Sequence, residues 1–453
     1  MKKALTLLLI SFNFLFAQEF TRKDTLIYQL EKTPIDTNRV NILDELINET
    51  YLNNPKEALK YSIEITELSD QLDFKIGMAQ GYGWQGYFYE ILGDIDQSLE
   101  MYFRTVTIYK EIHSFKQLST MYNNIAFCYM KTGKAELALE YNLKSLHLNV
   151  QLNDTSSIVA SLINTAGVYY RQDKFKLALE SCRTALILSM KKHDEILIAS
   201  SLRNLARIFK GQNDYEEAFY CYSMAYKLSS RLDDKEKMGK ELNGMGNVLE
   251  AQGNNMLAFE FYKKAMNVLG EFGYKREMGN TFNNVGHYYY LQNQLDSALI
   301  YYENALVNYR EILDNEGISQ ATYHLGEFYH QQKNNQLAEK FAQESYQLSE
   351  QMGYPTPIMN SSFLLYQCYE ANGKFKECVD INNRYLQIKD TVDSNEDRKL
   401  IEKQKEQFDE SIEAHKWELE EIERNKKLES KIIRRNLLEE IYCNIALWHL
   451  HSY

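Results

Sequence analysis

Small and apolar residues recur at a fixed spacing along most of the chain. A small residue is followed three positions later by an aromatic or other apolar residue, and a second small residue comes twelve positions after the first. The first small residues are Gly86, Ala126, Ala166, Ala206, Gly246, Gly286 and Gly326, and the second are Ser98, Ala138, Ala178, Ala218, Ala258, Ala298 and Ala338. Drifted copies at Leu46/Ala58 and Tyr366/Cys378 keep the same register. The pattern therefore predicts nine units of 40 residues over residues 37–392, with no insertion between them.

Each unit is predicted to be a pair of antiparallel helices. Small residues allow the two helices to pack closely, and Gly or Asn in segments 131–134, 252–255 and 372–374 suits the left-handed residue that ends a helix. Tyrosines on the second helices are expected to fill the gap to the next pair: Tyr102, Tyr222, Tyr262 and Tyr302. One pair cannot bury its apolar face alone, whereas stacked pairs can. The predicted fold is all-α, a right-handed superhelical solenoid with a concave groove, followed by a long coiled-coil-like helix.

These units resemble the tetratricopeptide repeat family over residues 37–392. The segments Ala258-Phe-Glu-Phe-Tyr-Lys-Lys-Ala265 and Ala298-Leu-Ile-Tyr-Tyr-Glu-Asn-Ala305 match the second-helix pattern of that family closely. The period of 40 residues is longer than the usual length of about 34. The tryptophan of the family's first helix is mostly absent, and Trp84 stands two positions late. The resemblance implies a module that binds a protein or peptide in its concave groove.

The N-terminal residues have the order of a secretory signal peptide. Lys2 and Lys3 precede a mostly apolar stretch from Ala4 to Phe16, and Ala17 offers a small residue for cleavage. The apolar run is too short for a membrane-spanning helix. We expect residues 1–17 to be the signal peptide, residues 18–36 to cap the array, and the protein to be exported to the periplasm or cell envelope. A retained N-terminal anchor is the alternative.

The pattern changes after the repeats. Residues 393–440 are dense in charged residues, and apolar positions at Phe408, Ile412, Leu419 and Ile422 alternate with steps typical of a coiled coil. This seam predicts a homodimer through residues 400–425, and a single helix that packs back on the last repeat is the alternative. The atypical tail, residues 441–453, is too short and polar to cross a bilayer.

The order of these segments resembles the sensor half of bacterial tetratricopeptide-containing histidine kinases or helix-turn-helix regulators. Residues 426–435 are basic, as in the approach to a membrane helix, but no kinase or DNA-binding pattern follows. We therefore expect a truncated member of this class, and a membrane link only if the tail is truncated. This makes the protein the sensing half of a signal-transduction protein that lacks its output domain. The alternative is a stand-alone periplasmic scaffold for envelope complexes.

Composition excludes several other functions. The formal net charge of −12 argues against a nucleic-acid partner, because binding phosphates requires a basic surface. No Cys-x-x-Cys pair occurs, and the histidines are scattered, so no metal site is expected. Five of the six cysteines fall within the repeats and are expected to be small buried residues, with Cys368 and Cys378 as the one pair to test for bridging. Phosphate-binding loops and catalytic motifs are missing, so we expect neither an enzyme nor a cofactor.

The predicted groove is basic and rich in amides near its middle. In the family, groove positions stand three before, one after and four after the first small residue. The candidate peptide-binding residues on this basis are Arg171, Arg203, Arg207, Lys210, Lys240, Asn243, Asn247, Asn283, His287 and Tyr290. Guanidinium groups bind carboxylates and amides bind peptide groups, so this set suits an extended peptide.

Overall fold

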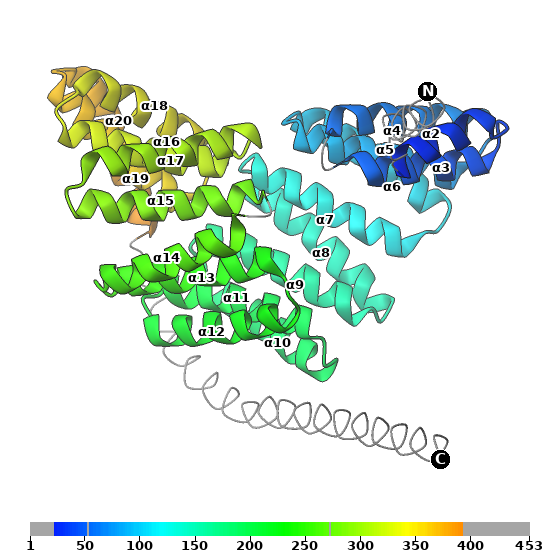
Figure 1. Cartoon of the computed structure of the whole chain (residues 1–453), viewed down its shortest axis with the longest axis horizontal. Helices are drawn as coiled ribbons and strands as arrows, with labels where there is room; N and C mark the ends of the chain where they lie inside the picture. Colours follow the sequence, from blue (N-terminus) through cyan, green and yellow to red (C-terminus); the bar gives the residue numbers. More distant parts are fainter. Residues whose placement is uncertain (1–21, 52–53, 271–272, 393–453) are drawn as a thin grey trace, which may run out of the picture. The chain divides into compact units, whose positions relative to one another are not determined.

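The computed structural model describes residues 22–51, 54–270 and 273–392, and every described element is a helix. The helices are α2 (Arg22–Lys32), α3 (Thr37–Thr50), α4 (Pro55–Gln71), α5 (Lys75–Ile91), α6 (Ile95–Glu111), α7 (Phe115–Lys131), α8 (Ala135–Gln151), α9 (Thr155–Arg171), α10 (Phe175–Lys191), α11 (Glu195–Gly211), α12 (Tyr215–Arg231), α13 (Lys235–Ala251), α14 (Asn255–Leu269), α15 (Lys275–Leu291), α16 (Leu295–Glu311), α17 (Asn315–Gln331), α18 (Asn335–Met352), α19 (Pro355–Ala371) and α20 (Phe375–Val392). They stack in successive antiparallel pairs, α3 with α4 through α19 with α20 (Figure 1).

The chain divides into two units, Met1–Asp393 and Ser394–Tyr453, and the described helices all belong to the first. The predicted signal peptide, the charged segment 393–440 and the tail 441–453 lie outside the described residues. Within the predicted capping segment, α2 buries Leu26 and its Lys23 pairs with Glu57 of α4 at 2.8 Å. None of the described helices has the length and apolar character needed to cross a membrane.

Almost every turn between described helices has the same backbone geometry. A residue with a left-handed backbone recurs every 20 positions from residue 73 to residue 373, with φ between 50° and 83°. Asp94 shows the associated cap, because its N–H donates to the carbonyl of Tyr89 at 2.9 Å, five residues back. Gly133, Gly253 and Gly373 occupy this position in the three turns that the sequence predicts. Most helices therefore have 17 residues, and a pair repeats every 40.

Glycines of the first helices let tyrosines pack at the crossing point of each pair. A Cβ added at Gly86 would lie 2.6 Å from the Tyr102 ring, and one at Gly286 would lie 2.7 Å from the Tyr302 ring. Both tyrosines are fully buried. The close crossing is confirmed, but the predicted place of the tyrosines is wrong in part. Tyr102, Tyr262 and Tyr302 pack against the glycine of their own pair, whereas Tyr222 packs against Gly244 of the next pair.

Helices far apart in the sequence also touch. The Tyr354 hydroxyl, just before α19, donates to the Met130 carbonyl of α7 at 2.7 Å. The Thr356 hydroxyl donates to the Asp173 carboxylate, after α9, at 2.9 Å. The start of the ninth pair therefore lies against the ends of the first helices in the third and fourth pairs.

Candidate functional site

A cavity of about 1080 Å³ lies along the first helices of successive pairs. Residues of α9, α11, α13, α15 and α17 line it, together with the start of α19. Nine of the ten predicted groove residues belong to this lining: Arg171, Arg203, Arg207, Lys210, Lys240, Asn243, Asn247, Asn283 and His287. Tyr290 does not line it, because it stands in the last turn of α15, where its ring lies between those of His287 and Phe328.

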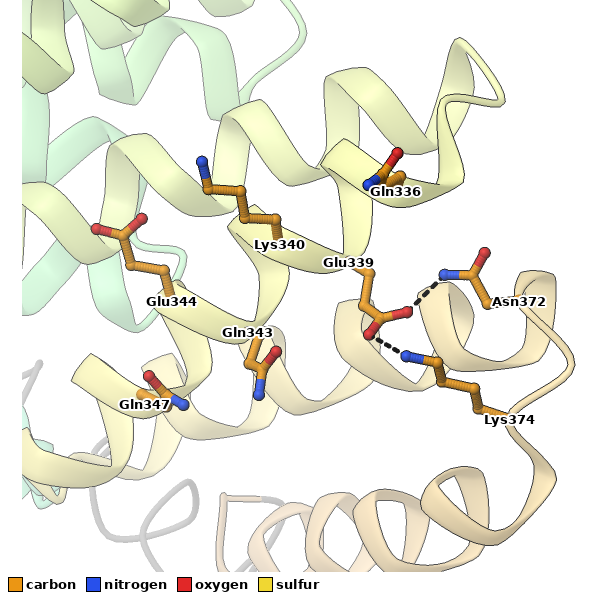
Figure 2. A pocket seen from close by; sticks show the side chains of 8 residues that line it. All are labelled: Gln336, Glu339, Lys340, Gln343, Glu344, Gln347, Asn372 and Lys374. Atoms are coloured by element: carbon orange, nitrogen blue, oxygen red, sulfur yellow. Dashed lines mark hydrogen bonds and ion pairs between the residues drawn. The ribbon is translucent and has the colours of Figure 1, made fainter.

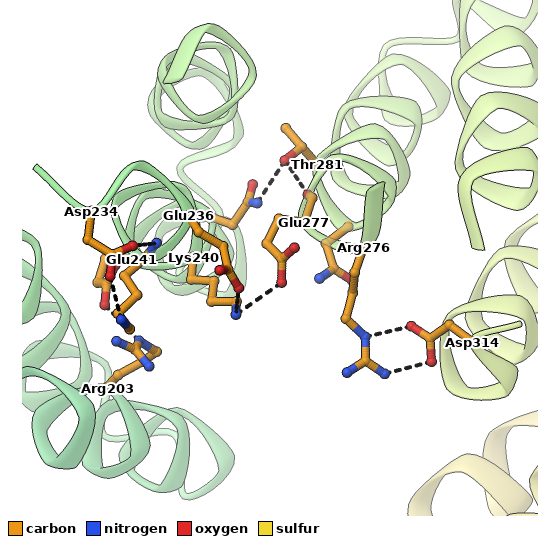
Figure 3. A network of polar contacts seen from close by, with 12 residues as sticks. Arg203, Asp234, Glu236, Lys240, Glu241, Arg276, Glu277, Thr281 and Asp314 are labelled. Atoms are coloured by element: carbon orange, nitrogen blue, oxygen red, sulfur yellow. Dashed lines mark hydrogen bonds and ion pairs between the residues drawn. The ribbon is translucent and has the colours of Figure 1, made fainter. Parts of the chain in front are cut away.

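Most cations of this cavity are paired with carboxylates of the neighbouring pair (Figure 3). Arg203 donates to Glu241 at 2.7 Å, and the Glu241 side chain is fully buried. Burial raises the pKa of Glu241, and the Arg203 guanidinium opposes that rise. Lys240 forms ion pairs with Glu236 and Glu277. The basic stripe that the sequence suggests is therefore largely neutralised from within.

One ion pair joins two non-neighbouring pairs of helices. Arg171 at the end of α9 donates twice, at 2.8 Å each, to the Glu316 carboxylate at the start of α17. Its guanidinium also lies 5.0 Å from the centre of the Tyr354 ring. Burial disfavours the charge on both partners, but their mutual attraction prevails: the pKa of Arg171 is raised and that of Glu316 is lowered. Arg171 therefore holds the cavity wall together.

Two cations on α11 differ from the rest. Arg207 lies 4.9 Å from the centre of the Tyr170 ring, and Lys210 stands one turn further along the same helix. Neither has a carboxylate within ion-pair distance in the described part of the chain. Burial lowers the pKa of Lys210, and the more distant Glu250 opposes that shift. We define these two residues as the α11 cation pair, and they are the cations of the cavity available to a ligand.

Two asparagines present unsatisfied amides to the cavity. Asn243 donates to the Thr281 hydroxyl at 2.7 Å, which leaves its Oδ1 without a partner. Asn283 occupies the same position one repeat later, is only 4% exposed, and neither Oδ1 nor Nδ2 has a partner. Buried amides normally form hydrogen bonds, and leaving one unmade costs about 1–3 kcal/mol. Asn247 differs, because its Oδ1 accepts from Tyr262 at 2.9 Å.

Histidines from successive repeats meet at another part of the wall. His287 is hydrogen-bonded through Nδ1 to Glu250, which also accepts from the Tyr262 hydroxyl at 2.6 Å. The His324 ring lies 5.8 Å from that of His287. The hydrogen bond to Glu250 raises the pKa of His287. Burial favours the neutral form of Glu250, but the hydrogen bonds from His287 and Tyr262 outweigh it and lower its pKa.

The polar partners share a spacing that the sequence reasoning missed. Arg203/Glu241, Asn243/Thr281 and Arg276/Asp314 are each 38 residues apart. Glu250/His287 and Lys240/Glu277 are 37 apart. Equivalent points on stacked repeats are 40 apart, so a partner slightly less than one period ahead lies opposite on the neighbouring first helix. This offset was readable from the sequence.

A second, smaller cavity of about 590 Å³ lies on α18 beside the last turn (Figure 2). Its lining side chains are all polar or charged. Glu339 there accepts from Asn372 at 2.6 Å and pairs with Lys374. These groups satisfy one another at an open surface.

Other chemistry is limited in the described residues. No group of His, Cys, Asp and Glu there could hold a metal ion. The five described cysteines are buried and unbridged, Cys368 and Cys378 included, as expected for small core residues. Burial raises the pKa of Cys128 and of Cys182 to about 12, which keeps these thiols protonated and unreactive.

Comparison with known proteins identifies the repeats. Residues 157–231 and 241–311 match the family model described as tetratricopeptide repeat. The repeat array therefore belongs to the tetratricopeptide repeat family. No curated protein matches the chain in sequence.

Two solved structures share the fold at low sequence identity. A Rap protein complexed with competence and sporulation factor is 14% identical with a TM-score of 0.55, and the match covers 79% of this chain and 98% of that one. The Rap conjugation gene regulator of the plasmid pLS20, in complex with the Phr* peptide, is 13% identical with a TM-score of 0.54 and coverages of 73% and 94%. The prediction of an all-α tetratricopeptide solenoid is confirmed.

Proposed function

We propose that the protein is a binding module whose cavity holds an extended peptide, or an extended segment of a protein partner. The observation that carries this proposal is the pair of unsatisfied amides at Asn243 and Asn283, both buried and both in the cavity lining. Amides offer a donor and an acceptor side by side, which matches the N–H and C=O groups of an extended backbone. A ligand with repeating peptide groups satisfies both positions at once.

The size and charge of the cavity support a peptide with a carboxylate. Its volume of about 1080 Å³ stands at the top of the range of about 300–1,000 Å³ for small-molecule pockets. The α11 cation pair, Arg207 and Lys210, would receive an acidic side chain or a C-terminal carboxylate. The two Rap structures are complexes, one with competence and sporulation factor and the other with the Phr* peptide, which supports the proposal through the shared fold.

The test uses a pool of fluorescent hexapeptides, each rich in Asp or Glu, and the full chain. The tightest peptides should bind at least tenfold more weakly to Arg207→Glu and to Lys210→Glu. They should also weaken when their carboxylates are replaced by amides. Lys264→Glu is the matched control, because Lys264 also lies over an aromatic ring, at 5.0 Å from the Phe261 centre, but does not line the cavity.

Two outcomes contradict this assignment. One is a pool in which no peptide binds. The other is equal loss of binding in Arg207→Glu and Lys264→Glu. Asn283→Ala separates the amide from the cation contribution, and it should weaken amidated and acidic peptides by the same factor.

We also propose that the module is exported and acts as the sensing half of a signal-transduction protein. The signal-peptide order of residues 1–17 and the charged segment 393–440 support this context. The stand-alone scaffold for envelope complexes remains the second candidate. Mass spectrometry of the chain from the envelope fraction should find a mature N-terminus at Gln18, and an intact Met1 in the cytoplasmic fraction would contradict export.

A further inference from the structure

The last described helix has an exposed apolar face. Phe375, Val379 and Leu386 of α20 are 74%, 60% and 48% exposed. Their spacing of four and seven residues puts them on one side of the helix. We define these three residues as the α20 face. This face is separate from the cavity.

The same register positions are covered in earlier repeats. Leu99 and Leu179 correspond to Val379, and Val106 and Leu306 correspond to Leu386, at multiples of 40 residues. All four are at most 8% exposed. The α20 face therefore retains the side chains that elsewhere form the contact between one pair of helices and the next.

The covering element in each earlier repeat is the first helix of the following pair. Leu306 and Tyr309 of α16 lie in one core cluster with Ile318 and Leu325 of α17. Leu99 and Val106 of α6 likewise share a cluster with residues of α7. No helix follows α20 in the part of the chain that the structure describes. A repeat array normally ends in a repeat with a polar outer face, and α20 lacks one.

We propose that a second copy of the chain covers the α20 face, with the two α20 helices packed antiparallel about a two-fold axis near Asn383. Val379 and Leu386 stand four residues before and three after Asn383, so each meets the other's counterpart across such an axis. Lys376 and Asp390 are both exposed and each stands seven residues from Asn383, which brings Lys376 of one copy opposite Asp390 of the other. Apolar contacts and charges are thus both self-complementary, as an isologous dimer requires.

The geometry also selects this partner over a head-to-tail copy. The opposite end of the array is formed by α2, whose first turns carry Arg22, Lys23 and Asp24. Arg22 already pairs with Glu45 and Glu49 of α3. That charged surface does not match an apolar one, whereas a second α20 face does.

Sedimentation of the full chain over a range of concentrations tests the proposal. The wild type should dimerise, and Leu386→Glu and Val379→Glu should each raise the dissociation constant at least tenfold. Leu257→Glu is the matched control, because Leu257 is 50% exposed on α14, away from this face, and its dissociation constant should stay within twofold of the wild type. Circular dichroism should show the same helix content in all variants.

A charge exchange tests the two-fold geometry itself. Lys376→Asp and Asp390→Lys should each weaken the dimer by placing like charges opposite each other, and the double variant should restore it. A monomeric wild type overturns the proposal. So does a dimer that Leu386→Glu leaves unchanged, as expected if residues 400–425 alone hold the copies together. Peptide binding does not enter these readouts, so they are independent of the proposed function.

Discussion

The cations of the cavity fall into two groups that look alike in the sequence and differ in the structure. Arg171, Arg203 and Lys240 each pair with a carboxylate of another helix. Arg207 and Lys210 have no such partner among the described residues, although Arg203 and Arg207 are one turn apart on the same helix. The paired cations therefore contribute to the stability of the wall, and the α11 cation pair contributes positive charge to the cavity.

The difference shows that a basic position in a repeat groove is not by itself a ligand site. A cation is available only if the position 37 or 38 residues away lacks a carboxylate. Arg203 has Glu241 at that distance, whereas Arg207 has Met245. A search for ligand-binding cations in such an array should therefore compare adjacent repeats.

The largest effect should come from removing Arg203. Arg203→Met leaves the Glu241 carboxylate buried without its partner, and breaking a buried pair in this way costs about 3–5 kcal/mol. The urea midpoint should fall accordingly. Arg203→Met combined with Glu241→Met should recover most of that loss, because the unpaired buried charge is gone.

Arg207→Met is the matched comparison on the same helix. It removes a ring contact and no ion pair, so the midpoint should change by less than about 1 kcal/mol in free energy of unfolding. Equal destabilisation by Arg203→Met and Arg207→Met would contradict the division into two groups.

A smaller effect should follow from filling the glycine behind His287. Gly286→Ala puts a Cβ at 2.7 Å from the Tyr302 ring, which stacks on His324 at 5.3 Å between ring centres. Overpacking of this kind costs about 1–3 kcal/mol. Gly167→Ala is the control, because nothing lies within 4 Å of its added Cβ and alanine favours a helix by up to about 1 kcal/mol. Thermal unfolding should therefore shift downward for the first variant and upward for the second.

The fold could be predicted from the sequence because the repeat states it many times. Each unit gives the same small residues at the same spacing, and the left-handed turns follow with Gly, Asn or Asp at most positions. His113 and Leu313 occupy the left-handed position without that composition, at φ of 55° and 53°. Those turns were predictable from the period and not from their own residues.

The candidate site could be predicted only in part. The register placed nine residues in one cavity, because groove positions depend on the period alone. It could not give the Arg171–Glu316 pair, whose partners are 145 residues apart and meet only through the path of the whole array. It also set aside His324, which lies beside His287 because of the offset between adjacent first helices.

The smallest predicted effect is a pH dependence confined to the histidine side of the wall. The hydrogen bond to Glu250 raises the pKa of His287, so its contribution to stability is complete below the ordinary histidine value of about 6.5 and is lost as the pH rises through the raised value. The lowered pKa of Glu250 makes its contribution present above about pH 4.3 and lost only as the pH falls through the lowered value. The pair should therefore stabilise the protein most near pH 5–6. His287→Gln should lower the melting temperature more at pH 6 than at pH 9, and Glu250→Gln combined with it should remove no further pH dependence in that interval. A difference between wild type and His287→Gln that stays constant from pH 6 to pH 9 would show that the His287–Glu250 bond contributes no titrating stability to the wall.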